Sequence, residues 1–301
     1  MKIEIYGLKI NVDISPGIDL AKLIVDEAEK QAYGVKEDDV IVVTSKIVSK
    51  AEGRIYRFAD VQPSRRAKAL SRIYHKDARE IELILRNSDS ISFIIPIYKF
   101  MKIYGKFFKD YARDERTAAE IIRKDPYIFM TSVKGMLLTD AGLDFSNSPE
   151  GYCTLPPKDP DESAKRMRER IRELTNKEVA IVITDTEWKL DKFGSIDIAI
   201  GSSGIQPVSR NFASKDLYGK PKFGGVDNLT DLVSATANLL FGQTNEAIPV
   251  VIIRGLKYER SEKGIKDVIY GKALRRAFRM AIWENVKFKL LLLLLSLLNI
   301  K

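Results

Sequence analysis

Three short runs of apolar, mostly β-branched residues constrain the fold of this chain more than any other feature. They span residues 40–44, 179–184 and 248–254 and read VIVVT, VAIVIT and IPVVIIR. Runs of this length and composition are typical of buried strands. Segments with helical character lie before, between and after these runs, and the expected helices are 19–31, 63–87, 117–124, 164–173, 229–241 and 268–288. The chain is therefore expected to contain both strands and helices.

Cysteine and histidine are nearly absent, and this narrows the possible chemistry. The 301 residues contain one cysteine, Cys153, and one histidine, His75. These counts exclude a disulfide framework and a zinc site built from cysteines, and they argue against a histidine-rich metal centre or a Ser-His-Asp triad. His75 lies in a charged helical segment and is expected to be solvated. Oxygen ligands would have to hold any metal, which favours magnesium or manganese.

The net charge of +9 indicates an anionic partner. Because the basic residues are mixed with 41 acidic ones, a small phosphorylated ligand is favoured over a nucleic-acid groove. The aromatic and basic segment 98–111 is interpreted as an amphipathic helix with its aromatic residues packed inward, and stacking on nucleic acid is the alternative. The N-terminus has no signal-peptide pattern, so a cytoplasmic protein is expected.

The C-terminal run Leu290 to Leu298 is strongly apolar and is interrupted only by Ser296. It is too short to span a bilayer, which requires about 20 residues. We expect it to be buried, either on the protein's own core or on a partner subunit, without membrane contact.

The stretch 139–164 combines acids, turn formers and a helix start. Asp140 and Asp144 flank Gly142, which permits a sharp turn, and residues 159–163 have the pattern of a capped helix entrance. A strand that ends in a loop bearing carboxylates is a common place for a metal or substrate site. The alternative is a surface loop whose carboxylates cap helix ends.

Polar residues also follow two of the buried strands. Residues 44–54 read TSKIVSKAEGR, and their hydroxyls and lysines could meet phosphate oxygens, or could form a polar strand end with a turn at Gly53. The segment is not a P-loop, because no glycine-rich run precedes the lysine. Asp185 ends the second strand and either holds a metal or caps the next turn. Asp227 opens a helix as a cap or as a further oxygen ligand.

At these positions the sequence resembles the GTP-dependent coenzyme F420-0:L-glutamate ligases. The matching pieces occur in the family's order from the first strand to Gly255, namely TSKIVSKAEGR, AGLDFSN, LPPKDPDESA, ITDT, DIAIGSSGI, DLYGK and IPVVIIRGL. The resemblance implies an α+β fold with a mixed sheet, unlike a Rossmann or P-loop enzyme, and an intertwined homodimer. It divides the chain into a ligase-like domain, 1–256, with an enlarged segment at about 63–130, and a helical extension, 257–301.

The chemistry implied by the resemblance is amide ligation. GTP would phosphorylate a carboxylate of the coenzyme precursor, and the amine of L-glutamate would attack the acyl phosphate. Two divalent ions, magnesium or manganese, would bridge the phosphates and protein acids, with potassium as a further candidate. Residue by residue, the implied catalytic positions are Asp144, Asp185 and Lys46. The implied metal positions are Asp144, Asp185, Thr186 and Asp227. The implied nucleotide positions are Tyr6, Gly7, Leu8, Lys9, Ser45, Lys46, Lys50 and Asn147.

The sequence departs from the family pattern at several places. Trp188, Lys189 and Lys192 stand where the family has Gly-Arg and a further basic residue, and Lys9 stands in place of a proline. A lysine does not reproduce the bidentate fork of an arginine. Two alternatives to the leading interpretation follow: a paralogue that ligates an amino acid to another carboxylate, and a non-catalytic nucleotide-binding regulator.

Overall fold

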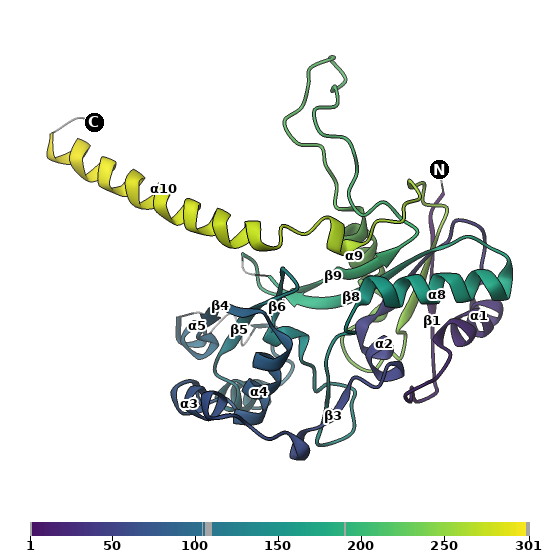
Figure 1. The fold of residues 1–301 in the computed structure, drawn as a ribbon, viewed down its shortest axis with the longest axis horizontal. Helices are drawn as coiled ribbons and strands as arrows, with labels where there is room; N and C mark the ends of the chain where they lie inside the picture. Colours follow the sequence, from purple (N-terminus) through teal and green to yellow (C-terminus); the bar gives the residue numbers. More distant parts are fainter. Residues whose placement is uncertain (1, 104, 106–109, 190, 299–301) are drawn as a thin grey trace.

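A five-stranded mixed sheet forms the centre of the protein (Figure 1). The computed structural model describes residues 2–103, 105, 110–189 and 191–298. The strand order is β1-β10-β2-β8-β9, in which β2 and β8 are parallel and the other neighbours are antiparallel. The strands are β1 (Glu4–Leu8), β2 (Val40–Thr44), β8 (Ala180–Trp188), β9 (Ser195–Ser203) and β10 (Val250–Arg254). The predicted α+β class with a mixed sheet is confirmed.

Helices cover both faces of this sheet, and this explains why its central strands are apolar along their whole length. Ile41 and Ile181 face α1 (Leu20–Gln31) and α8 (Pro160–Thr175) in one buried cluster. Val42 and Val182 face α9 (Leu229–Phe241) in another. The two clusters pack against the central strands from both faces, which positions the residues at the ends of these strands.

Side-chain caps start these helices. Asp19 accepts a hydrogen bond from the backbone N–H of Lys22 at 3.0 Å. Asp159 accepts one from Glu162 at 3.2 Å, and Pro160 occupies the first turn of α8. A carboxylate at this position satisfies an N–H group that the helix itself cannot pair. The capped entrance predicted at residues 159–163 is confirmed.

A second lobe between β3 and β7 has its own three-stranded antiparallel sheet, β4-β5-β6. The helix expected over 63–87 is two helices, because His75 adopts a left-handed conformation with φ of 50° and Asp77 caps the next helix. His75 is exposed, as expected. The elements are β3 (Ile55–Arg57), η1 (Phe58–Asp60), α3 (Arg65–Tyr74), α4 (Ala78–Asn87), β4 (Ser90–Ile95), α5 (Ile97–Ile103), α7 (Glu115–Lys124), β5 (Ile128–Val133), β6 (Met136–Thr139), η2 (Asp140–Gly142) and β7 (Tyr152–Thr154).

The chain ends in η3 (Ile265–Asp267) and the long helix α10 (Lys272–Leu297), which projects away from the body (Figure 1). The side chains of Leu290 to Leu294 are between 49 and 58% exposed. The expectation that this run docks on the protein's own core is therefore wrong. Within the part of the chain that the structure describes, no helix is both long and apolar enough to cross a membrane.

Candidate functional site

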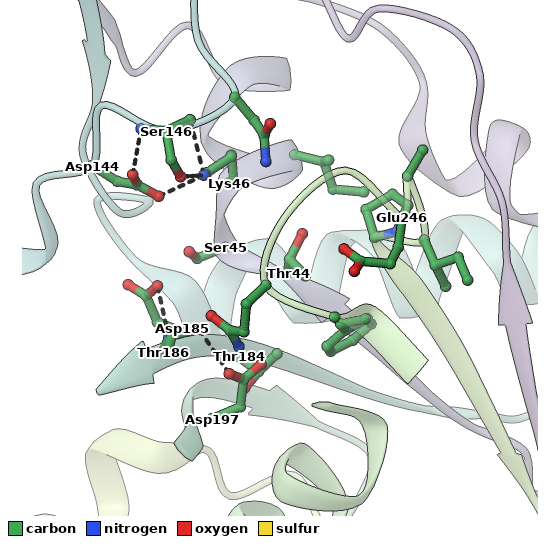
Figure 2. A pocket seen from close by; sticks show the side chains of 18 of the residues that line it. Thr44, Ser45, Lys46, Asp144, Ser146, Thr184, Asp185, Thr186, Asp197 and Glu246 are labelled. Atoms are coloured by element: carbon green, nitrogen blue, oxygen red, sulfur yellow. Dashed lines mark hydrogen bonds and ion pairs between the residues drawn. The ribbon is translucent and has the colours of Figure 1, made fainter. Parts of the chain in front are cut away.

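A cavity of about 570 Å³ opens where β2 ends, beside residues 184–187 of β8 (Figure 2). Segments that are distant in the sequence surround it: residues 10–14 after β1, the start of α2 (Ser45–Ala51), the turn after β6, the outer half of β8, Asp197 of β9 and the loop before β10. The polar residues among those that line it are Thr44, Ser45, Lys46, Lys50, Thr139, Asp144, Ser146, Asn147, Thr184, Asp185, Thr186, Glu187, Asp197, Gln243, Thr244, Asn245 and Glu246. The cavity therefore holds both carboxylates and ammonium groups.

Residues 45–51 form a helix and not the extended segment that the strand-end alternative required. Lys46 and Lys50 are four residues apart, so they lie on the same side of this helix. Both line the cavity together with Ser45. Lys50 also lies 3.6 Å from the carboxylate of Asp13. The expected turn at Gly53 is present, with φ of 69°.

Asp144 is held beside Lys46. The Lys46 ammonium lies 2.6 Å from the Asp144 carboxylate and donates to the Ser146 carbonyl at 2.9 Å. The backbone N–H of Ser146 donates to the Asp144 carboxylate at 2.7 Å. Figure 2 shows this group on one wall of the cavity. The lysine neutralises part of the negative charge that Asp144 and the other acids bring to the cavity.

The turn that carries Asp144 has an unusual backbone. Asp140, Ala141 and Gly142 have successive φ values of 47°, 59° and 71°. The left-handed conformation is unfavourable for residues with a side chain. A Cβ at Gly142 would lie 2.4 Å from Pro156 Cγ, so only glycine fits there. The predicted sharp turn is thus confirmed, and it directs Asp144 toward the cavity.

Asp185 lies on β8 and faces Asp144 across the cavity (Figure 2). It was expected to end its strand, but β8 continues to Trp188, so that expectation is wrong. Burial, followed by the charges of Glu187 and Asp144, raises the pKa of Asp185 to about 8. Its carboxylate accepts a hydrogen bond from the Thr186 N–H at 3.0 Å, and in the described part of the chain it has no lysine or arginine partner. Such a carboxylate is available to a cation.

Three further acids, Glu187, Asp197 and Glu246, line the cavity and were not predicted as site residues. The Thr186 hydroxyl donates to Asp197 at 2.7 Å, and burial raises the pKa of Asp197. Glu187 accepts from the Thr139 hydroxyl at 2.6 Å. Asp197 lies opposite Thr186 in the β8–β9 pairing. Asp197 could have been recognised as a cavity residue only from this strand register.

Tyr6, Gly7, Leu8 and Lys9 are not among the residues that line the cavity. Leu8 is fully buried in the core, and the Tyr6 ring lies 5.0 Å from the Arg254 guanidinium. The following residues Ile10, Val12 and Ile14 line the cavity instead. The segment that follows the first strand therefore contributes an apolar wall.

Two other predicted positions, Asn147 and Asp227, differ in whether they line the cavity. Asn147 lines the cavity and donates from Nδ2 to the Thr244 carbonyl at 3.1 Å, which joins two of the surrounding loops. Asp227 is exposed and lies outside the lining, and its N–H donates to the Ser209 hydroxyl at 2.8 Å. Asn228, not Asp227, caps α9.

A separate acidic cluster lies in the second lobe. Carboxylate oxygens of Glu80, Asp125 and Asp140 lie within 4.8 Å of one another, an arrangement that could hold a metal ion. The ammonium of Lys76 lies 2.6, 2.7 and 3.2 Å from these three carboxylates, respectively. The Lys76 ammonium therefore already occupies the cluster. We interpret these four side chains as an internal ion network that fixes the position of η2 through Asp140.

Comparisons with known proteins agree on one family. Residues 7–255 match the family described as F420-0:Gamma-glutamyl ligase. The chain is 36% identical over 258 residues to a coenzyme F420:L-glutamate ligase of Methanopyrus kandleri, covering 85% of this chain and 88% of that protein. It is 34% identical over 270 residues to the protein of that description from Archaeoglobus fulgidus, covering 90% and 94%.

Proposed function

The chain belongs to the F420-0:gamma-glutamyl ligase family, and from this we propose that it joins L-glutamate to a coenzyme F420 precursor through an amide bond. We propose further that the reaction consumes GTP, requires a divalent metal and passes through an acyl phosphate. The observation that carries this proposal is the convergence of Asp144, Asp185 and Lys46 on one cavity.

The donor groups of the cavity fit magnesium or manganese. Both ions prefer oxygen ligands, and magnesium is usually held by one or two carboxylates together with substrate phosphates. Asp144 and Asp185 can supply these carboxylates, and Thr186 can supply a hydroxyl. Among the described residues, the group of three acids placed to hold a metal ion is the one around Lys76. The acids of the cavity therefore do not form a complete metal site by themselves. The phosphates would then complete the coordination, which links metal binding to nucleotide binding.

A bound divalent ion would supply positive charge to the triphosphate and increase the electrophilicity of its terminal phosphorus. Lys46 and Lys50 would orient the phosphates as point charges, and Ser45 would donate a hydrogen bond to them. A carboxylate oxygen of the precursor attacks the phosphorus, and GDP leaves. The glutamate amine, having lost a proton, then attacks the acyl carbon and inorganic phosphate leaves.

We also propose a homodimer, supported by the projecting arm formed by residues 209–227 (Figure 1). Leu217, Tyr218 and Phe223 on this arm are 101, 89 and 100% exposed. Large apolar side chains that protrude in this way usually contact a partner. Light scattering on the wild type and on a Leu217→Ser, Phe223→Ser variant tests this assembly. A monomeric wild type would contradict it.

The second candidate function is ligation of an amino acid to a different carboxylate substrate, and one observation favours it. Trp188 packs edge-on against Phe100 of α5, with ring centroids 6.4 Å apart, and Lys189 pairs with Asp191 at 3.3 Å. The basic residues that replace the family's arginine thus lie outside the cavity lining. The third candidate is a regulator that binds nucleotide without turnover.

Product mass spectrometry tests the proposal and separates these candidates. The purified protein is incubated with precursor, L-glutamate, GTP and manganese, and each component is omitted in turn. The proposal predicts a product heavier by one or more glutamyl residues, and it predicts that continued turnover with release of GDP requires all four components. Turnover only with a different acid would favour the paralogue, and binding without turnover would favour the regulator.

A further inference from the structure

The end of α10 presents apolar side chains in every direction around the helix axis. Leu290, Leu291, Leu292, Leu293 and Leu294 are consecutive, and successive residues of a helix point about 100° apart. All five are about half exposed, and Leu297 is 72% exposed. Figure 1 shows this part of α10 far from the sheet. The protein body therefore leaves the whole circumference of this segment in contact with solvent.

A second helix could cover only one side of this segment. A coiled-coil seam uses two positions in seven, and the remaining positions are polar in a soluble assembly. Here the positions that would face water are leucines as well. Lipid acyl chains can surround a helix on all sides, and a helix that is apolar all round is typical of such an environment.

The part of α10 that precedes the leucines is basic and aromatic. Arg276, Arg279 and Lys289 are exposed, as is the indole of Trp283. Cations next to an apolar segment are attracted by the negative surface of a membrane, and tryptophan favours the boundary between headgroups and acyl chains. The order along the helix, basic and aromatic first and apolar afterwards, matches the order of layers entered from water.

We propose that α10 anchors this protein to one leaflet of an anionic lipid membrane. Residues 290–298 rise about 14 Å as a helix, which is roughly half of a hydrocarbon core of about 30 Å. The segment enters the acyl region without crossing it, Lys289 beside the first leucine contacts the lipid phosphates, and Arg276 and Arg279 lie farther out toward the water. This departs from the expectation of no membrane contact, and it is independent of the ligation chemistry.

Vesicle flotation of the full-length protein tests the anchor. Phosphatidylcholine vesicles with and without phosphatidylglycerol are the probes, and light scattering without vesicles reports the oligomeric state. The wild type is expected to float with anionic vesicles, and high salt is expected to weaken this binding. A Leu291→Ser, Leu292→Ser, Leu294→Ser variant is expected to bind at least about tenfold more weakly.

The control variant is Leu232→Ser, which changes a leucine of comparable exposure, 54%, on α9 and is expected to leave flotation unchanged. Lys289→Gln is expected to weaken binding to anionic vesicles by about fivefold. An unchanged thermal midpoint shows that each variant body is folded. Absence of flotation, flotation that survives the triple substitution, or an oligomer that depends on the tail without vesicle binding would each overturn the proposal.

Discussion

The ammonium of Lys46 lies 2.6 Å from the carboxylate of Asp144, and this ion pair joins the first turn of α2 to the turn that follows η2. Both groups line the cavity, so the pair fixes a positive charge beside an acid proposed to hold metal. If a triphosphate binds as proposed, the same ammonium would contact its oxygens, and Asp144 would be free to hold the proposed divalent ion.

Lys46→Met should lower kcat for ligation by about 10²- to 10³-fold, because one fixed positive charge at the transferring phosphate is lost. Stability should change by no more than about 1 kcal/mol, since the pair is partly exposed. Steady-state kinetics and urea unfolding measure the two effects. Lys22→Met removes the exposed pair with Asp26 and serves as the control. An unchanged kcat in Lys46→Met would remove this residue from the proposed machinery.

Gly142→Ala should disturb the site more than an equivalent glycine change elsewhere. Gly142 has φ of 71°, and a Cβ there would lie 2.4 Å from Pro156 Cγ. Gly151 has φ of 79°, but a Cβ there would meet nothing within 4 Å. Gly151→Ala should therefore cost only the conformational term of about 1–2 kcal/mol. Gly142→Ala should cost more and should also reduce ligation, because Asp144 follows this turn.

Unfolding free energies and turnover numbers for the two alanine variants give a direct comparison. Equal losses of stability, with ligation retained in both, would show that the close approach to Pro156 does not position Asp144.

Lys76→Met should destabilise the protein strongly. The Lys76 side chain is fully buried among Glu80, Asp125 and Asp140, and these charges raise its pKa although burial opposes the charged form. Removing one member of a buried ion network leaves unpaired charges and costs about 3–5 kcal/mol. Urea unfolding at neutral pH measures this loss. Stability should recover in part at acidic pH, where protonation removes the unpaired charges, and a loss below 1 kcal/mol would contradict the network.

Glu80 should make the fold less stable as the pH rises. Burial, with the charge of Asp125, raises the pKa of Glu80 from 4.5 to about 7, although the Lys76 ammonium opposes the shift. The folded state thus holds this proton more tightly than the unfolded chain. The resulting stabilisation is full below the unfolded pKa and is lost between pH 4.5 and about 7.

Between pH 4.5 and about 7, the free energy of unfolding should therefore fall less in Glu80→Gln than in the wild type. Glu82 is the matched control on the same helix, because hydrogen bonds from Ser64 lower its pKa and its contribution is lost only on acidification. A Glu80→Gln profile parallel to that of the wild type would contradict the assigned pKa.

The sequence predicted the central strands well because these strands are buried on both faces. Val40 to Thr44 and the helix Leu229 to Phe241 have the predicted bounds. Asp144 and Asp185, predicted from turn and strand-end patterns and from family resemblance, do meet at one cavity. Local composition was informative there because each residue lies beside a strand or a turn with a strong sequence signal.

The places of other residues depend on tertiary structure and could not be predicted from the neighbouring sequence. Asp197 enters the cavity through its register with Thr186. Residues 45–51 contain β-branched side chains but form a helix, because the chain reverses where β2 ends. Leu290 to Leu298 would normally be buried, and their exposure follows from the direction in which α10 leaves the body.

The most direct test of the ligation site is product formation by Asp185→Asn in the presence of precursor, L-glutamate, GTP and manganese. The substitution keeps the side-chain shape and removes the charge that would hold the metal. Asp26→Asn, at an exposed carboxylate paired with Lys22, is the control. We predict no glutamylated product from Asp185→Asn and a normal yield from Asp26→Asn, with both proteins folded. Product from Asp185→Asn at the wild-type rate would contradict the account.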